Sequence, residues 1–122
     1  MLDLTRSAVT DPTAVYRPRD GLYAADLLTA AIVELDFFTW LEAHPGDAAS
    51  ICRGLGIQPR PTDVMLTLFC SRGFIRRVGE RYEVTAVARE FLVRGGPFFA
   101  GPYYATLHDR PVARDYVQVL RT

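Results

Sequence analysis

The sequence predicts a mainly α fold: a winged-helix domain with a short β-hairpin wing and extra helices for dimerisation. Two observations predict it. Between residues 47 and 85, two helical segments that each end at a glycine precede two short β-prone runs around a glycine turn. Before and after this segment, apolar residues recur at helical spacing. The winged helix serves DNA-binding proteins as well as domains that only dimerise, so the fold leaves the function open.

The first helix of the winged helix is predicted over residues 48–55. It follows the turn at Pro45 and Gly46, and Asp47 can accept backbone N–H bonds as its N-cap. Gly56 can end it in the left-handed conformation, which a residue without a Cβ adopts without strain. These signals define a helix of about two turns.

The second helix is predicted over residues 61–72. Pro61 suits the first helical position, where a missing N–H costs nothing, and Gly73 ends the helix. Residues 74–78 and 81–84 are rich in β-prone side chains and flank a turn at Gly79 and Glu80. This hairpin is the predicted wing.

Residues 1–20 are a polar arm interrupted by two prolines, which predicts a flexible or partner-binding tail. Asp20 can cap a helix over residues 21–35. We expect this helix to break at Asp36, because aspartate tolerates a positive φ angle, and a second apolar turn follows over residues 37–41.

Beyond the wing, Thr85 can cap a helix over residues 86–94, which the pair Gly95 and Gly96 ends. Residues 98–120 predict two further helices, separated near Pro111. The domain prediction is therefore an arm over residues 1–20 and a helical dimerisation domain over residues 21–122, with the winged helix at about residues 47–85.

Composition limits the class of protein. A chain of 122 residues with 49% hydrophobic content predicts one packed domain. It has no apolar run long enough to cross a membrane and no signal-peptide pattern, so we expect a cytoplasmic protein without a membrane partner. Cys52 and Cys70 lie among apolar neighbours without metal-ligand spacing, which predicts reduced, buried thiols and no metal site.

The helix over residues 21–35 is apolar around most of its circumference. Such a helix must be buried on most faces, and a chain of this size buries only about two thirds of the surface that it exposes when unfolded. Some apolar surface should therefore meet another chain or domain, and we expect a homodimer. The candidate interface residues are Leu27, Leu28, Ala31, Ile32, Leu35 and Phe38.

The alternative function is a winged-helix transcription regulator that binds DNA. Fourteen acidic residues balance fourteen basic residues, so the chain lacks the positive charge that drives binding to nucleic acid. The exposed arc of the second helix is expected to show Arg60, Asp63, Thr67 and Ser71, which is a poor set for contacting bases. The wing arginines alternate with glutamates, so we expect a solvated hairpin and no nucleic-acid partner.

Three ordered motifs carry a resemblance to a known family. They are LLTAAIVELDFFTWL at residues 27–41, IQPRPTDVMLTLFCSRGFI at residues 57–75 and RYEVTAVAREFLVRGGPFF at residues 81–99. Together they resemble the N-terminal dimerisation region of S-adenosylmethionine-dependent O-methyltransferases that act on small molecules. The resemblance implies a winged helix that does not bind DNA. One departure is Asp36, where relatives more often have glycine.

The resemblance also implies what this chain lacks. In the family a Rossmann-like methyltransferase domain follows, and it holds S-adenosylmethionine and the general base. The adjacent glycines here close a helix instead of following a strand, so we expect no cofactor-binding and no catalytic residue in this chain. S-adenosylmethionine is expected for the intact enzyme, and the chain is expected to be a fragment or a split gene product.

The family uses this region to support the pocket for the methyl acceptor, here expected to be a small aromatic or polyketide-like hydroxyl compound. The matching candidates for substrate contact are Tyr103, Tyr104, Leu107 and His108. Core packing is the competing role for each of them. A third reading of the whole chain is a free-standing carrier that binds small ligands through its C-terminal aromatic residues.

Overall fold

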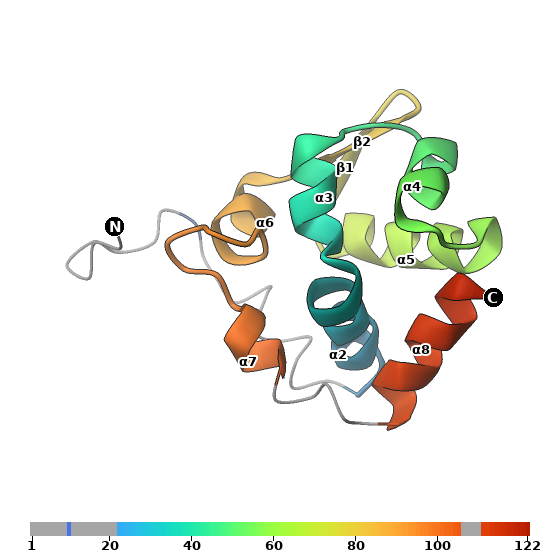
Figure 1. Cartoon of the computed structure of the whole chain (residues 1–122). Coiled ribbons are helices and arrows are strands. Elements are labelled where there is room, and N and C mark those ends of the chain that lie inside the picture. Colours follow the sequence, from blue (N-terminus) through green and yellow to red (C-terminus); the bar gives the residue numbers. More distant parts are fainter. Residues whose placement is uncertain (1–9, 11–21, 106–110) are drawn as a thin grey trace.

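The computed structural model describes residue 10, residues 22–105 and residues 111–122 (Figure 1). It confirms the predicted fold class, because the described chain is mainly helical with a two-stranded antiparallel hairpin. The predicted arm over residues 1–20 lies outside the described residues, Thr10 excepted. Asp20, the predicted N-cap of the helix over residues 21–35, also lies outside them. In Figure 1 the first helices form a central column, with the winged-helix-like unit around its upper end.

The central column consists of α2 (Leu22–Thr29), η1 (Ala30–Leu35) and α3 (Phe37–Ala43). The predicted single helix over residues 21–35 is thus an α-helix that continues as a wider π-helix. Asp36 breaks the column as predicted, with φ of 52° in the left-handed region. It is the one non-glycine residue with a positive φ among the described residues. Helices α7 (Gly101–Ala105) and α8 (Pro111–Arg121) both contact α2 and η1.

Helix α4 (Ala48–Leu55) has the bounds that the sequence predicts. The N–H of Ser50 donates to Oδ1 of Asp47 at 2.8 Å, and Gly56 ends the helix with φ of 66°. Helix α5 (Pro59–Ser71) begins two residues earlier than predicted, because Pro59 takes a first-turn position with Gln58 as the N-cap.

The wing is a hairpin of β1 (Ile75–Val78) and β2 (Arg81–Val84), in which Ile75 pairs with Val84. Gly79 turns the chain between them with φ of 63°. The hairpin is attached to the loop before α4, since the N–H of Tyr82 donates to the carbonyl oxygen of Gly46 at 2.7 Å. The wing is therefore held at its second strand by the helical part.

Helix α6 (Ala86–Phe91) is shorter than the predicted 86–94. Thr85 occupies its N-cap position but makes no side-chain cap, so that prediction was wrong in its chemistry. Its hydroxyl donates instead toward the carbonyl oxygens of Gly73 and Phe74, at 2.6 and 3.0 Å. Thr85 thereby ties the end of the wing to its beginning. Pro111 begins α8, which agrees with the predicted break.

An aromatic cluster joins the column to the winged-helix-like unit. The ring of Phe38 lies 5.0 Å from both Phe37 and Phe69, centroid to centroid, and 6.2 Å from Phe74. All four rings are buried. The C-terminal end of α8 is fixed to the loop between α4 and α5, because the N–H of Gln58 donates to the carbonyl oxygen of Leu120 at 2.6 Å.

Candidate functional site

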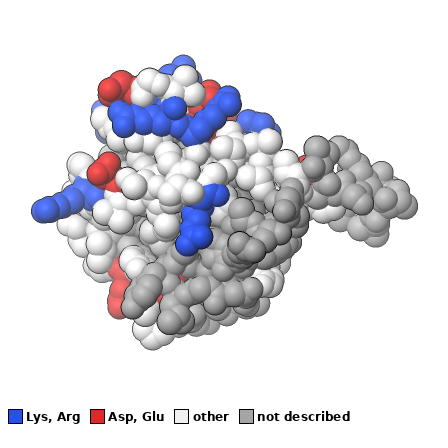
Figure 2. Space-filling model, turned by 180° about the vertical axis from the view of Figure 1, so that it is seen from behind, with Lys and Arg blue, Asp and Glu red and all other residues white. Residues whose placement is uncertain are grey.

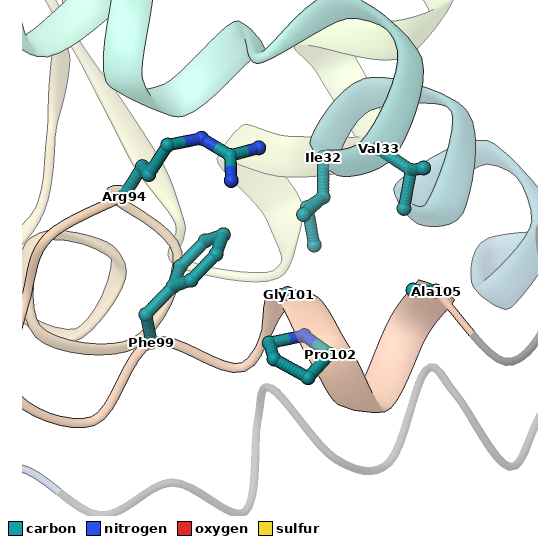
Figure 3. Close-up of a pocket in the computed structure, with 7 residues that line it drawn as sticks. All are labelled: Ile32, Val33, Arg94, Phe99, Gly101, Pro102 and Ala105. Carbon is teal, nitrogen blue, oxygen red and sulfur yellow. The ribbon is translucent and has the colours of Figure 1, made fainter.

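A hollow of about 280 Å³ lies between η1 and α7 (Figure 3). Figure 3 shows Ile32 and Val33 pointing from η1 toward α7, with Arg94 and Phe99 at one end of the space. We call it the η1–α7 hollow, and its lining residues are Ile32, Val33, Arg94, Phe99, Gly101, Pro102 and Ala105. Its volume is near the lower end of the range for ligand pockets, about 300–1,000 Å³.

Arg94 is the charged residue of this lining, and three neighbouring groups fix its position. Its Nε and Nη2 donate to the carboxylate of Asp36 at 3.1 to 3.3 Å. Its guanidinium carbon lies 5.2 Å from the centre of the Phe99 ring, which is a cation–π contact. Its backbone N–H donates to the hydroxyl oxygen of Thr39 at 2.8 Å. The guanidinium is therefore held in place at the end of an otherwise apolar space.

Gly101 is required for the position of the Phe99 ring. A Cβ atom at residue 101 would lie 2.2 Å from two carbons of that ring, closer than any tolerated contact. The glycine at the start of α7 therefore lets the ring lie against the backbone and beneath Arg94. Sequence reasoning missed both Arg94 and Phe99, and no local pattern marks them as a pair.

Of the substrate-contact candidates from the sequence, the two that the structure describes do not line this hollow. Tyr103 and Tyr104 are on α7, with their rings 5.7 Å apart in an edge-to-face arrangement. Tyr104 is completely buried in the core, and Tyr103 is exposed. Leu107 and His108 lie outside the described residues. The smaller residues of α7 face the hollow instead.

The six interface candidates from the sequence belong to the hydrophobic core of the chain itself. Each is at most 8% exposed in the single chain. They are Leu27, Leu28, Ala31, Ile32, Leu35 and Phe38. Because these side chains pack inside the single chain, they can support a dimer only indirectly, by holding the helices of the protomer together.

A second surface is more apolar than the hollow. Helices α2, α5 and α8 enclose a groove of about 300 Å³, which we call the α5–α8 groove. At its edges Val64 is 64% exposed and Val119 is 56% exposed, values that are high for large aliphatic side chains. Its lining residues are Leu27, Arg60, Pro61, Val64, Tyr116, Val119 and Leu120.

The surface over the wing carries charges of both signs (Figure 2). Nε of Arg76 lies 2.9 Å from a carboxylate oxygen of Glu83, and Arg77 is 3.7 Å from Glu80. On α5 the side chains of Met65, Leu66 and Phe69 are buried in the core. The arginines of the wing that are paired with glutamates offer little free positive charge to a DNA duplex.

The remaining reactive side chains show no joint site in the described part of the chain. There, no three histidine, cysteine or acidic side chains come together to hold a metal ion. Cys52 and Cys70 are free and half-buried, and burial raises the pKa of the Cys70 thiol. The ring of His44 stacks on Trp40 at 4.9 Å, centroid to centroid. No described helix is long and apolar enough to cross a membrane.

No family model matches the chain. Over 92 residues, it is 38% identical to the 3-hydroxy-5-methyl-1-naphthoate 3-O-methyltransferase of Streptomyces sahachiroi; the match covers 75% of this chain and 26% of that enzyme. The homologues of the present chain are S-adenosylmethionine-dependent O-methyltransferases. The relationship does not favour the DNA-binding alternative.

Solved structures of O-methyltransferases agree with this relationship. The whole chain superposes on 37% of an O-methyltransferase family 2 protein from Planctomyces limnophilus in complex with apigenin, with a TM-score of 0.80 and 27% identity. PigF with SAH matches 84% of this chain and 30% of its own length, with a TM-score of 0.66 and 27% identity. The chain thus spans 26% to 37% of the length of these O-methyltransferases and matches their N-terminal region.

The described residues do not fit an S-adenosylmethionine site. Dinucleotide-type and related cofactor loops place glycines directly after a strand, where the backbone approaches the cofactor. The adjacent glycines here, Gly95 and Gly96, follow α6, and Gly95 turns the chain with φ of 90°.

Proposed function

We propose that this chain is the dimerisation and substrate-pocket-supporting N-terminal domain of an S-adenosylmethionine-dependent O-methyltransferase. The observation that carries the proposal is the match of the entire chain to one end of the Planctomyces protein, at a TM-score of 0.80. The methyl donor and the general base belong to a second domain in this proposal, and the present chain is not catalytic alone. A cytoplasmic location is part of the same proposal.

The proposed acceptor is a small aromatic or polyketide-like hydroxyl compound. The Streptomyces relative is named for a hydroxynaphthoate, and the Planctomyces protein is in complex with apigenin. The hydroxynaphthoate and apigenin are both aromatic compounds with hydroxyl groups. The η1–α7 hollow has apolar walls that suit a flat ring.

The proposed partner is a second copy of the chain. The exposed valines of the α5–α8 groove, Val64 and Val119, are the support for it in the described part of the chain. Sedimentation equilibrium at micromolar concentration tests the dimer, and a stable monomer would contradict it. Failure to bind duplex DNA at low salt would remove the transcription-regulator alternative.

A chimaera tests the enzymatic part of the proposal. This chain replaces the corresponding N-terminal region of the Streptomyces enzyme, and methyl transfer to the hydroxynaphthoate is measured. We expect activity from the chimaera and none from this chain alone. A folded chimaera that binds the methyl donor but transfers no methyl group would contradict a pocket-supporting role.

A further inference from the structure

We propose that the η1–α7 hollow binds a planar aromatic carboxylate, with the ring between its apolar walls and the carboxylate on Arg94. The inference rests on the proposed function only in identifying this ligand with the methyl acceptor. Binding itself is a property of the described residues of this chain. The inference narrows the acceptor class from aromatic hydroxyl compounds to aromatic acids.

The apolar walls select the ring. Ile32 and Val33 form one side of the hollow, and Gly101, Pro102 and Ala105 of α7 form the other (Figure 3). No polar side chain other than Arg94 belongs to the described lining. A flat hydrocarbon ring can fill such a space without leaving a polar group unpaired, and the volume of about 280 Å³ suits one or two fused rings.

Arg94 selects the carboxylate. A guanidinium has five N–H donors, and the bonds to Asp36 come from Nε and Nη2. Among the described residues Nη1 has no hydrogen-bond partner. The side chain is 56% exposed, so this edge can be reached by a ligand. Arginine and carboxylate form strong, charge-assisted bonds with defined geometry.

The position of Arg94 is set before any ligand arrives. Asp36, Thr39 and the Phe99 ring hold its head and its backbone. A group that is already ordered loses less conformational entropy on binding, which favours affinity. Asp36 has an opposing effect as well, because its negative charge partly neutralises the guanidinium and repels a second carboxylate.

The first test measures binding to the intact 122-residue chain by isothermal titration calorimetry. The probe is 1-naphthoate, with 1-naphthamide as the neutral ligand of the same shape and cyclohexanecarboxylate as the acid without a planar ring. We expect 1-naphthoate to bind at least about tenfold more tightly than either control. Equal affinities for the acid and the amide would overturn the inference.

Two variants break the same ion pair from opposite sides. Arg94→Gln should weaken 1-naphthoate binding about tenfold and leave 1-naphthamide unchanged. Asp36→Asn should tighten 1-naphthoate binding, because the amide oxygen of asparagine can still accept a hydrogen bond from the guanidinium while the competing negative charge is gone. If the ion pair matters only for folding, both variants will change binding in the same direction, and the inference fails. Thermal melts of both variants show whether each remains folded.

A third variant tests the location. Ala105 is exposed on α7, so Ala105→Phe should be tolerated by the fold while filling the hollow, and it should abolish binding of the acid and the amide alike. Unchanged binding would place the ligand elsewhere and overturn the inference. If none of the ligands binds at millimolar concentration, the inference is wrong, yet the proposed function survives as long as the chain dimerises and the chimaera transfers methyl groups.

Discussion

Arg94 and Asp36 form a two-point ion pair across 58 positions of the sequence, with three nitrogen-to-oxygen distances of 3.1 to 3.3 Å. Asp36 is also the left-handed residue that ends η1. One carboxylate therefore marks the break in the central column and orients the cation of the η1–α7 hollow. Both side chains are about half exposed, so the pair itself stabilises the fold by less than about 1 kcal/mol.

Replacement of Asp36 separates the backbone effect from the ion pair. Asp36→Gly removes the ion pair but also the strain of a left-handed L-residue, so we expect a free energy of unfolding within about 1 kcal/mol of the original. Asp36→Ala loses the pair and keeps a Cβ at φ of 52°, and it should be about 1–2 kcal/mol less stable than the glycine variant. Urea unfolding measures both. Equal stability of the two variants would show that the φ angle carries no cost.

Thr62 offers a stabilising substitution. It is completely buried on α5, and in the described part of the chain its hydroxyl oxygen has no hydrogen-bond partner. Thr62→Val replaces the hydroxyl by a methyl group of similar size, so it should raise the free energy of unfolding by about 1 kcal/mol. Thr62→Ser is the control, because it keeps the hydroxyl and loses the methyl group. It should be destabilising, and a stabilising serine would contradict this account.

Gly54 should be intolerant of the smallest side chain. In an open helix, glycine to alanine stabilises by about 1 kcal/mol. Here a Cβ would lie 2.1 Å from Cζ2 of Trp40, so Gly54→Ala should instead cost about 1–3 kcal/mol. Repeating the substitution in a Trp40→Leu background should recover the ordinary helix preference. A double-mutant cycle in urea measures this coupling, and additive effects would contradict the contact.

Asp47 should make the stability depend on pH in acid. Hydrogen bonds from Ser50, first of all from its backbone N–H, lower the pKa of this carboxyl below its ordinary value of 3.8. Because the folded pKa is the lower one, the stabilisation is present above the unfolded pKa and is lost as pH falls through the folded pKa. Asp47→Asn still caps α4 but does not titrate. The stability difference between the original and this variant should be constant near neutral pH and shrink below about pH 4. A difference that is unchanged in acid would contradict the cap.

The elements that the sequence predicts well are those that local chemistry determines. The bounds of α4 follow from Asp47 and Gly56, which act on their immediate neighbours, and the wing follows from Gly79 between two β-prone runs. The break at Asp36 is of the same kind. Thr85 shows the limit of local prediction. It has the right position for an N-cap of α6, but its hydroxyl donates to the carbonyl oxygens of Gly73 and Phe74, just before the hairpin.

The candidate site could not be predicted in this way. Arg94 and Asp36 meet only because α6 packs against α3, and that packing depends on the whole core. The sequence suggests the aromatic residues of α7 as ligand contacts. A helix of five residues is too short, however, for the sequence pattern to predict which of its side chains face the core and which face the hollow. Tyr104 is buried in the core, and the small residues Gly101 and Ala105 line the hollow.

Charges at the α5–α8 groove should separate the copies of the proposed dimer. Val64→Asp or Val119→Asp places a carboxylate on an apolar surface, and its desolvation on association would cost several kcal/mol. Because both valines are more than half exposed in the single chain, the fold of each protomer should be unaffected. Sedimentation equilibrium should therefore show monomers with an unchanged melting curve. Thr67→Asp is the matched control, since Thr67 is exposed on the same helix outside the groove lining, and it should remain dimeric. If both valine variants stay dimeric, the interface lies on another surface of the chain.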